Sequence, residues 1–281
     1  MSALVYFAVL IAALLHASWN ALVKGGSDKQ LNMTAVVLGH VPLAVLALLF
    51  VPPPARESWP FILSGIILHS FYQLFLLRAY LIGDLTQVYP IARGSAPLLV
   101  AAVSVLFLGV TLQGVEILAI LTIGAGILSM SLVRQSDGQR NMKAARLALT
   151  TGCFIAAYSI VDGLGARLAG SALGFFGWLA IGNAAVFALV TALRSPQVLP
   201  RLARHGKRTF FIGGSASFVA FSIVIWAFTQ APIALVTALR EISIVFALLI
   251  GVFFLKERMN LIKVLSTTVT LLGAALLRFA R

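Results

Sequence analysis

Apolar runs of roughly 20 residues follow one another along almost the whole chain, and short polar connections separate them. A helix needs about 20 apolar residues to cross the hydrocarbon core of a bilayer. The pattern therefore predicts an all-α polytopic membrane protein, in which the first run is a retained helix and not a cleaved signal peptide. We place ten transmembrane helices at 3–22, 32–51, 59–79, 86–108, 113–133, 147–167, 172–193, 209–229, 233–254 and 260–279.

Composition agrees with this class. Hydrophobic residues make up 60% of the chain and charged residues 10%, with a mean hydropathy of +1.03. A soluble domain carries about 25% charged residues. The net charge of +13 does not indicate a nucleic-acid partner, because the basic residues gather at helix ends. No motif suggests a metal or cofactor, and the single cysteine, Cys153, can form no disulfide within the chain.

The basic residues are distributed unevenly between the two sides of the membrane. Apart from Arg93 and Arg240, which fall inside spans, nearly all lie in the connections after the first, third, fifth, seventh and ninth spans. By the positive-inside rule these connections are cytoplasmic, and both termini are periplasmic. The basic segment 195–208 is expected to be a cytoplasmic loop that contacts anionic lipid. The exceptions on the other side are Arg56, Arg167, Arg278 and Arg281.

The two halves of the chain resemble each other. "RAYLIGDLTQVYPIARGSAPLLVAAVSVLFLG" (78–109) aligns with "WAFTQAPIALVTALREISIVFALLIGVFFLKE" (226–257) without gaps. We expect two five-helix repeats, at 1–135 and 145–281, joined by a cytoplasmic connector at 136–144. Since five is odd, the second repeat enters the membrane from the opposite side, as in the inverted repeats of secondary transporters. The alignment pairs Ala79 with Ala227, Val88 with Val236, Arg93 with Glu241 and Ser95 with Ser243.

Arg93 is the sharpest candidate for chemistry, because a charge inside a membrane is costly and usually faces a cavity or the bundle interior. It lies in "YPIARGSAP" (89–97), where Pro90, Gly94 and Pro97 predict a break in the helix. Tyr89 lies one turn before Arg93 on the same face. Two readings are open and compatible: Arg93 binds a carboxylate, phosphate or phosphonate, or it pairs with Glu241.

Span 9 carries Thr237, Arg240 and Glu241. On a continuous helix Arg240 and Glu241 are offset by about 100°, so we expect their side chains to point in different directions. Glu241 is the best candidate for coupling transport to protons. The alternative, which the sequence favours, is that Arg93 or Arg240 neutralises it permanently.

Polar stripes on three other spans are expected to line the same pathway. For each residue alone, the alternative is an interhelical hydrogen bond worth about 0.6 kcal/mol. The convergence of several stripes favours a pathway. The stripe residues are His16, Trp19 and Asn20 in span 1, His69 and Gln73 in span 3, and Tyr158 and Asp162 in span 6.

The sequence resembles the drug/metabolite transporter superfamily, in its ten-helix EamA-like branch. The resemblance is carried by "HASWNALVK" (16–24), "AYLIGDLTQVYPIARGSAP" (79–97) and "FFLKERMN" (253–260), and it extends over nearly the whole chain. More narrowly, the second motif is similar to membrane proteins associated with phosphonate utilisation. The sequence departs from the family at Lys256, where glycine is usual, and at Val110, where a glutamate is expected. The resemblance implies two inverted repeats and transport of a small metabolite by alternating access.

The favoured function is a secondary active transporter for a small anionic or zwitterionic metabolite, such as an amino acid or phosphonate. The chain contains no P-loop, H-E-x-x-H or G-x-S-x-G motif, so neither an ATP-driven pump nor an enzyme is expected. The alternatives are a non-transporting receptor or structural subunit, and an exporter of hydrophobic cations. We expect a bacterial inner-membrane protein, monomeric or homodimeric, whose partners are its substrate and lipids, with proton coupling as an option.

Overall fold

The computed structural model describes residues 1–25, 28–82, 85–129, 142–253 and 261–279, and this part of the chain is helical without strands. Helices lie within each of the ten expected ranges. The first half contains α1 (Ala3–Gly25), α2 (Lys29–Leu38), α3 (Val41–Leu48), the 3₁₀ turn η1 (Arg56–Ser58), α4 (Trp59–Ile82), α5 (Leu85–Leu106) and α6 (Gly114–Ser129). The second contains α7 (Met142–Leu168), α8 (Ala172–Arg194), α9 (Val198–His205), the π-helical turn η3 (Thr209–Gly213), α10 (Gly214–Gln230), α11 (Ile233–Arg240), α12 (Ser243–Phe253) and α13 (Leu261–Phe279).

Six helical segments of the described chain are long and apolar enough to cross a membrane. They begin at Ala3, Lys29, Arg56, Met142, Ala172 and Thr209. Three further apolar helices, Ile91–Leu106, Gly114–Ser129 and Val264–Leu277, are shorter. The total of ten crossings therefore stays a prediction, while the membrane-embedded, all-helical class is confirmed.

Two local expectations are wrong, namely the break in the fourth span and the loop at 195–208. Helix α5 runs without interruption from Leu85 to Leu106, so Pro90, Gly94 and Pro97 do not break it. A proline removes one backbone donor, and neighbouring helices in a membrane protein can accommodate that loss. The interruptions lie instead in the second and ninth spans, between α2 and α3 and between α11 and α12. Segment 195–208 contains α9, in whose first turn Pro200 costs no helical hydrogen bond.

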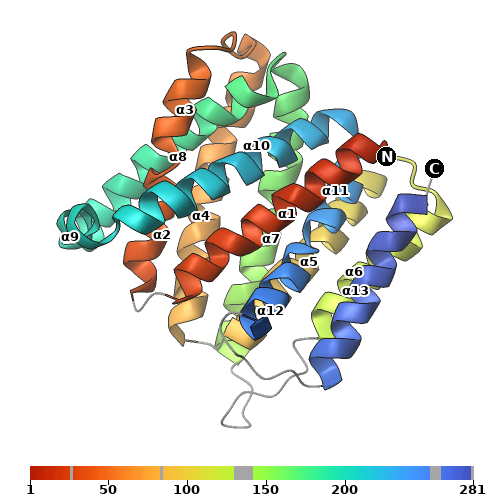
Figure 1. Cartoon of the computed structure of the whole chain (residues 1–281). Coiled ribbons are helices and arrows are strands. Elements are labelled where there is room, and N and C mark those ends of the chain that lie inside the picture. Colours follow the sequence, from red (N-terminus) through yellow and green to blue (C-terminus); the bar gives the residue numbers. More distant parts are fainter. Residues whose placement is uncertain (26–27, 83–84, 130–141, 254–260, 280–281) are drawn as a thin grey trace.

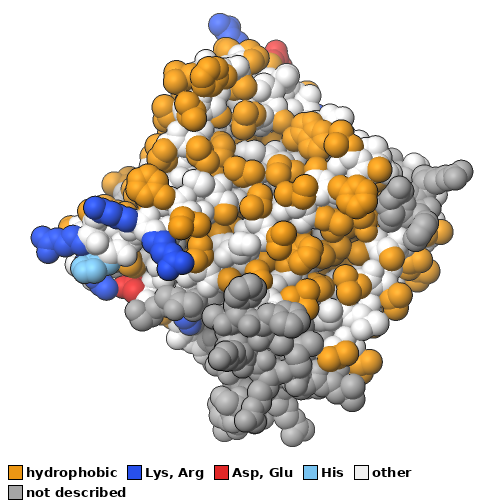
Figure 2. Space-filling model, in the orientation of Figure 1, with side chains coloured by type: hydrophobic (Ala, Val, Ile, Leu, Met, Phe, Trp, Pro, Cys, Tyr) orange, Lys and Arg blue, Asp and Glu red, His pale blue; other side chains and the backbone are white. Residues whose placement is uncertain are grey.

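The bundle places apolar side chains outward and polar side chains inward. On α1, Leu4, Phe7, Ile11 and Leu14 are exposed, whereas His16 on the opposite face is buried. Figure 2 shows that hydrophobic side chains cover most of this face of the molecule, and that basic side chains gather over α9. This arrangement fits a protein whose body is surrounded by lipid and whose basic end meets a headgroup region.

Helix pairs from the two halves of the chain pack together across the bundle. Helix α4 packs on α7, and α10 packs on α1; α5 packs on α7, and α12 packs on α1. Helices α6 and α13 lie side by side at one edge (Figure 1). Close to the chain ends, the Tyr6 hydroxyl donates a hydrogen bond to the Ala274 carbonyl over 3.2 Å.

Polar contacts tie neighbouring connections together at helix ends. Asp28 caps α2 by accepting a hydrogen bond from the Leu31 amide, and its other carboxylate oxygen lies 2.8 Å from Arg201 of α9. At another set of helix ends, the Ala55 amide donates to the Ala169 carbonyl. The connections after the first and seventh spans therefore meet, as do those after the second and sixth. This agrees with the charge analysis, which places odd-numbered connections on one side of the membrane and even-numbered connections on the other.

Candidate functional site

A buried ion-pair centre joins the two halves of the chain. Arg93 of α5 places its Nε 2.8 Å from Oε2 of Glu241, and the two side chains are 3% and 0% exposed. Arg240 places its Nε 3.8 Å from the other carboxylate oxygen, Oε1. Arg93 also donates a hydrogen bond from Nη2 to the Ser243 hydroxyl over 3.2 Å. One carboxylate therefore faces two guanidinium groups, and this centre carries a net positive charge.

The break between α11 and α12 brings these groups together. Helix α11 ends at Arg240, and the Glu241 and Ile242 amides donate to the carbonyls three residues earlier, those of Ala238 and Leu239. The expected divergence of Arg240 and Glu241 is therefore wrong, because the 100° offset applies only to a continuous helix. The turn lets both side chains point inward.

A histidine–aspartate pair lies next to this centre. His69 of α4 places Nε2 2.8 Å from Oδ2 of Asp162 on α7, and both side chains are buried. The His69 ring stacks on Tyr158, with 4.1 Å between ring centroids. The Tyr158 hydroxyl accepts a hydrogen bond from Arg240 Nη2 over 3.2 Å. Tyr158 thus connects the histidine–aspartate pair to the ion-pair centre.

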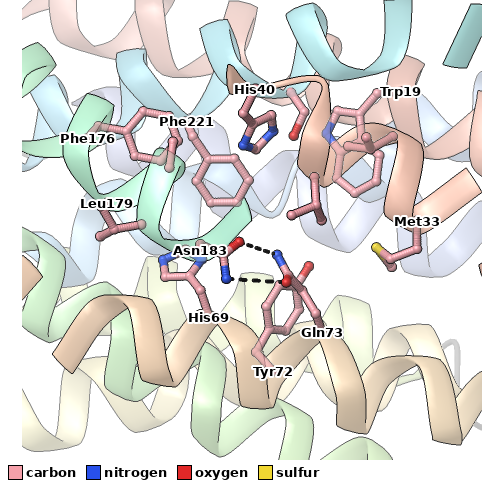
Figure 3. Close-up of a pocket in the computed structure, with 14 residues that line it drawn as sticks. Trp19, Met33, His40, His69, Tyr72, Gln73, Phe176, Leu179, Asn183 and Phe221 are labelled. Atoms are coloured by element: carbon pink, nitrogen blue, oxygen red, sulfur yellow. Dashed lines mark hydrogen bonds between the residues drawn. The ribbon is translucent and has the colours of Figure 1, made fainter. Parts of the chain in front are cut away.

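A small cavity adjoins His69 and lies among α1, α2, α4, α8 and α10 (Figure 3). The space that the centre of a water molecule can occupy there is about 20 Å³, which is enough for one water but not for a metabolite. Aromatic rings dominate the wall, and the amides of Gln73 and Asn183 add polar groups. The lining includes Trp19, Met33, His40, Tyr72, Phe176 and Phe221.

The side-chain amides of Gln73 on α4 and Asn183 on α8 form two hydrogen bonds with each other. Gln73 Nε2 donates to Asn183 Oδ1 over 3.0 Å, and Asn183 Nδ2 donates to Gln73 Oε1 over 3.4 Å and to the Ser70 hydroxyl over 3.1 Å. Figure 3 shows the two amide–amide bonds as dashed lines beside the cavity. This pair fixes the position of α4 against α8.

Replacing Gln73 with leucine is expected to lower the free energy of unfolding by about 1–3 kcal/mol, because the buried Asn183 Oδ1 then loses its donor while Nδ2 keeps its bond to Ser70. The double variant with leucine at both positions is expected to regain most of that loss, since no buried amide is left unpaired. Chemical unfolding in detergent measures both, and Gln230→Leu at an exposed position is the control. A double variant no more stable than Gln73→Leu would contradict the pairing.

Only some of the predicted pathway residues line the cavity. His69, Gln73 and Trp19 line the cavity, while Tyr158 and Asp162 lie behind His69. His16 accepts a hydrogen bond from the Trp19 indole, and Asn20 donates to the His16 carbonyl on its own helix. Thr237 is buried on α11. Tyr89 and Pro90 lie in α5, and their side chains are outside the described part of the structure, as is the 254–260 turn.

Sequence reasoning missed several residues of the site. Asn183 carried a usable signal, because it is a polar residue within an apolar span. The aromatic residues Phe176 and Phe221 carried none, since phenylalanine is common throughout the chain. Outside the ion-pair centre of Arg93, Arg240 and Glu241, three buried polar atoms of the described side chains have no hydrogen-bond partner: His40 Nε2, Asp162 Oδ1 and Thr237 Oγ1.

Comparison with known proteins identifies the family. Residues 142–279 match the EamA-like transporter family. The second half of the chain is therefore an EamA-like transporter domain. This family is part of the drug/metabolite transporter superfamily, whose members are membrane transporters and not enzymes. The match covers α7 to α13 and includes Tyr158, Asp162, Arg240 and Glu241.

A solved structure shares the fold of this EamA-like protein. A crystal structure aligns over 100% of this chain and 99% of its own, with a TM-score of 0.78 and 18% sequence identity. At this level of identity the likeness concerns the fold alone. No curated protein matches the sequence.

Proposed function

We propose that this EamA-like protein is a secondary active transporter that moves a small anionic or zwitterionic metabolite by alternating access, without ATP. The observation that carries the proposal is a buried centre in which two guanidinium groups, those of Arg93 and Arg240, share the carboxylate of Glu241. A buried charge is costly unless a counter-charge contacts it directly. An anionic substrate group can supply that charge by replacing a Glu241 oxygen at one guanidinium.

Equivalent helices of the two halves make equivalent contacts, and this symmetry supports the inverted repeat. If α1 corresponds to α7, α4 to α10 and α5 to the pair α11–α12, the packing of α4 on α7 has its counterpart in the packing of α10 on α1. Likewise, α5 packs on α7 while α11 and α12 pack on α1. We therefore propose repeats at 1–135 and 145–281, with the substrate site where they meet. The connector at 136–144 lies outside the described residues.

The size of the cavity supports alternating access. It admits about one water, so a metabolite requires a second conformation in which the helices around the cavity separate. We propose a multi-pass protein of a bacterial inner membrane, with cytoplasmic odd-numbered connections and periplasmic termini. Amino acids and phosphonates are the substrate classes that the guanidinium pair fits best.

A ligand panel on the purified protein tests the proposal. A true ligand is expected to raise the melting temperature, because it binds the folded state only. The panel contains amino acids, phosphonates, phosphate esters and hydrophobic cations. Arg93→Lys keeps the charge beside Glu241 but removes the bidentate fork, and it is expected to weaken the response to the ligand at least tenfold. Arg201→Lys, at an exposed arginine, is the matched control.

Transport of the stabilising ligand is then measured in proteoliposomes. Uptake that Arg93→Lys reduces and Arg201→Lys leaves intact supports the assignment. Stabilisation by hydrophobic cations alone would favour the exporter of hydrophobic cations, for which the aromatic cavity wall is suited. Equal transport by the Arg93→Lys variant and the wild type would rule out Arg93 as the anion contact.

A further inference from the structure

The histidine–aspartate pair has one unused carboxylate oxygen. Asp162 Oδ2 contacts His69 Nε2, whereas Asp162 Oδ1 is buried without a hydrogen-bond partner. This oxygen lies against Gly65 of α4, where an added Cβ would come within 2.8 Å of it. His69 itself lines the cavity, which has room for a water. The pair is therefore a buried titratable group with a neighbouring place for the water that would deliver a proton.

The charges of the pair and of the ion-pair centre balance only in one protonation state. Arg93 and Arg240 are positive, and Glu241 and Asp162 are negative when ionised. The four charges cancel when His69 is neutral. Tyr158 places Arg240 and His69 in one connected group, because its ring stacks on His69 and its hydroxyl bonds to Arg240. A proton on His69 gives this buried group a net charge of one, which favours the entry of a monoanion.

Among the described residues, Asp162 is the carboxylate that contacts His69, and the other titratable side chains against its ring are Tyr72 and Tyr158. From α1, His16 accepts a hydrogen bond from Trp19 at Nδ1 and packs on Phe221. The ring of His40, at the junction of α2 and α3, also packs on Phe221 of α10, which in turn contacts His69. Helix α8 contributes the neutral Asn183, and α7 contributes Tyr158. The remaining charges are those of Arg93, Arg240 and Glu241.

We propose that the His69–Asp162 pair is the proton-binding site of the transporter, and that a proton and a monoanionic substrate bind together. The proton passes from cavity water to the pair, giving an imidazolium beside a carboxylate, and no other bond changes. Binding of each partner favours the other by the same factor, because coupling between two sites is reciprocal. This inference rests on the proposed transport function.

The pair suits this task better than Glu241. The Glu241 carboxylate faces guanidinium groups at both oxygens. Protonating it would neutralise the carboxylate that contacts both guanidinium groups, at a cost typical of breaking a buried ion pair. Protonating His69 instead preserves every ion pair of the centre and strengthens its own contact with Asp162. Glu241 thus holds the two arginines, while the His69–Asp162 pair takes up the proton.

Titration of the histidines by ¹⁵N NMR in nanodiscs tests the site without any substrate. The chain has four histidines, so the His69 resonance is assigned with His69→Gln or, by elimination, with glutamine at His16, His40 and His205. We expect acidification of the wild type to change the His69 ring resonances. Asp162→Asn is expected to reduce this response, because the carboxylate that would balance the imidazolium is gone. A His69 that keeps one protonation state from pH 5 to pH 8 would overturn the proposal.

Transport in proteoliposomes tests the coupling and separates it from the transport assignment. With the ligand identified by the panel, an inward proton gradient is expected to change the initial rate about fivefold or more in the wild type. This response is expected to disappear in His69→Gln and to persist in His205→Gln. Panel transport with an unchanged gradient response in His69→Gln would overturn the proton site alone. A titrating His69 in a protein that moves no panel member would support the proton site and count against the transport function.

Discussion

Glu241→Gln is expected to lower the free energy of unfolding by about 3–5 kcal/mol, which is the cost of leaving a buried charge without its partner. Glutamine is close to glutamate in shape, so the cavity term is small and the loss reports charge. Arg93 and Arg240 would then face each other in the protein interior, where each side chain is 3% exposed or less. Reversible unfolding in mixed micelles, followed by circular dichroism, gives the difference.

The double variant Arg93→Gln/Glu241→Gln separates charge from shape. It removes one positive and one negative charge, so the net charge of the centre is the same as in the wild type. We expect it to be more stable than Glu241→Gln by at least about 2 kcal/mol, as a directly contacting pair requires. Glu57→Gln, at an exposed acid of η1, is the control and is expected to change stability by less than about 0.5 kcal/mol. Equal stability of the single and double variants would show that the pair contributes no coupling.

Much of the fold follows from the length of the apolar runs. An apolar run of 20 residues with two charges or fewer has few alternatives to a helix in a bilayer, so the positions of α1, α4, α7, α8 and α10 are predictable. The interruptions are not. Two prolines fail to interrupt α5, whereas the sequence between α11 and α12, "ALREISI" (238–244), has neither proline nor glycine. The interruption at Glu241 coincides with its ion pair to Arg93 on another helix, which is a tertiary contact.

The candidate site was partly predictable for a different reason. The internal alignment places Arg93 opposite Glu241, and the structure brings these two residues into contact. The polar stripes likewise included both members of the His69–Asp162 pair, although no local pattern shows that they face each other. The aromatic wall of the cavity depends on which sides of α8 and α10 turn inward. That orientation is set by packing, so Phe176 and Phe221 could not be chosen from the sequence.

A close backbone contact beside the cavity wall is also invisible in the sequence. Gly39, between α2 and α3, lies against the backbone of the π-helical turn at Phe210 and of Gly214 at the start of α10. A Cβ at Gly214 would come within 2.6 Å of the Gly39 Cα. Glycine allows this approach because it has no side chain. The contact holds the α2–α3 wall, which carries Met33 and His40, against the wall from α10.

Gly39→Ala is therefore expected to destabilise the protein by about 3 kcal/mol, at the upper end of the range for overpacking, because the obstacle is backbone and cannot rotate away. Gly213→Ala is the matched comparison. Its Cβ would meet the Val36 side chain at 3.2 Å, which can adjust, so we expect a loss below about 1 kcal/mol. Gly114→Ala, where no atom lies within 4 Å, should leave stability unchanged.

The same series tests whether this crossing shapes the cavity. If Gly39 holds the two walls together, alanine there is expected to widen the cavity and to expose His40 and Met33 to water-borne reagents. Oxidation of Met33 to its sulfoxide, quantified by mass spectrometry, should be faster in Gly39→Ala than in Gly213→Ala and the wild type. A Gly39→Ala variant that melts and oxidises like Gly213→Ala would show that the walls meet through side chains. The cavity would then owe its closed shape to the aromatic cluster of Phe176, Phe218 and Phe221 instead.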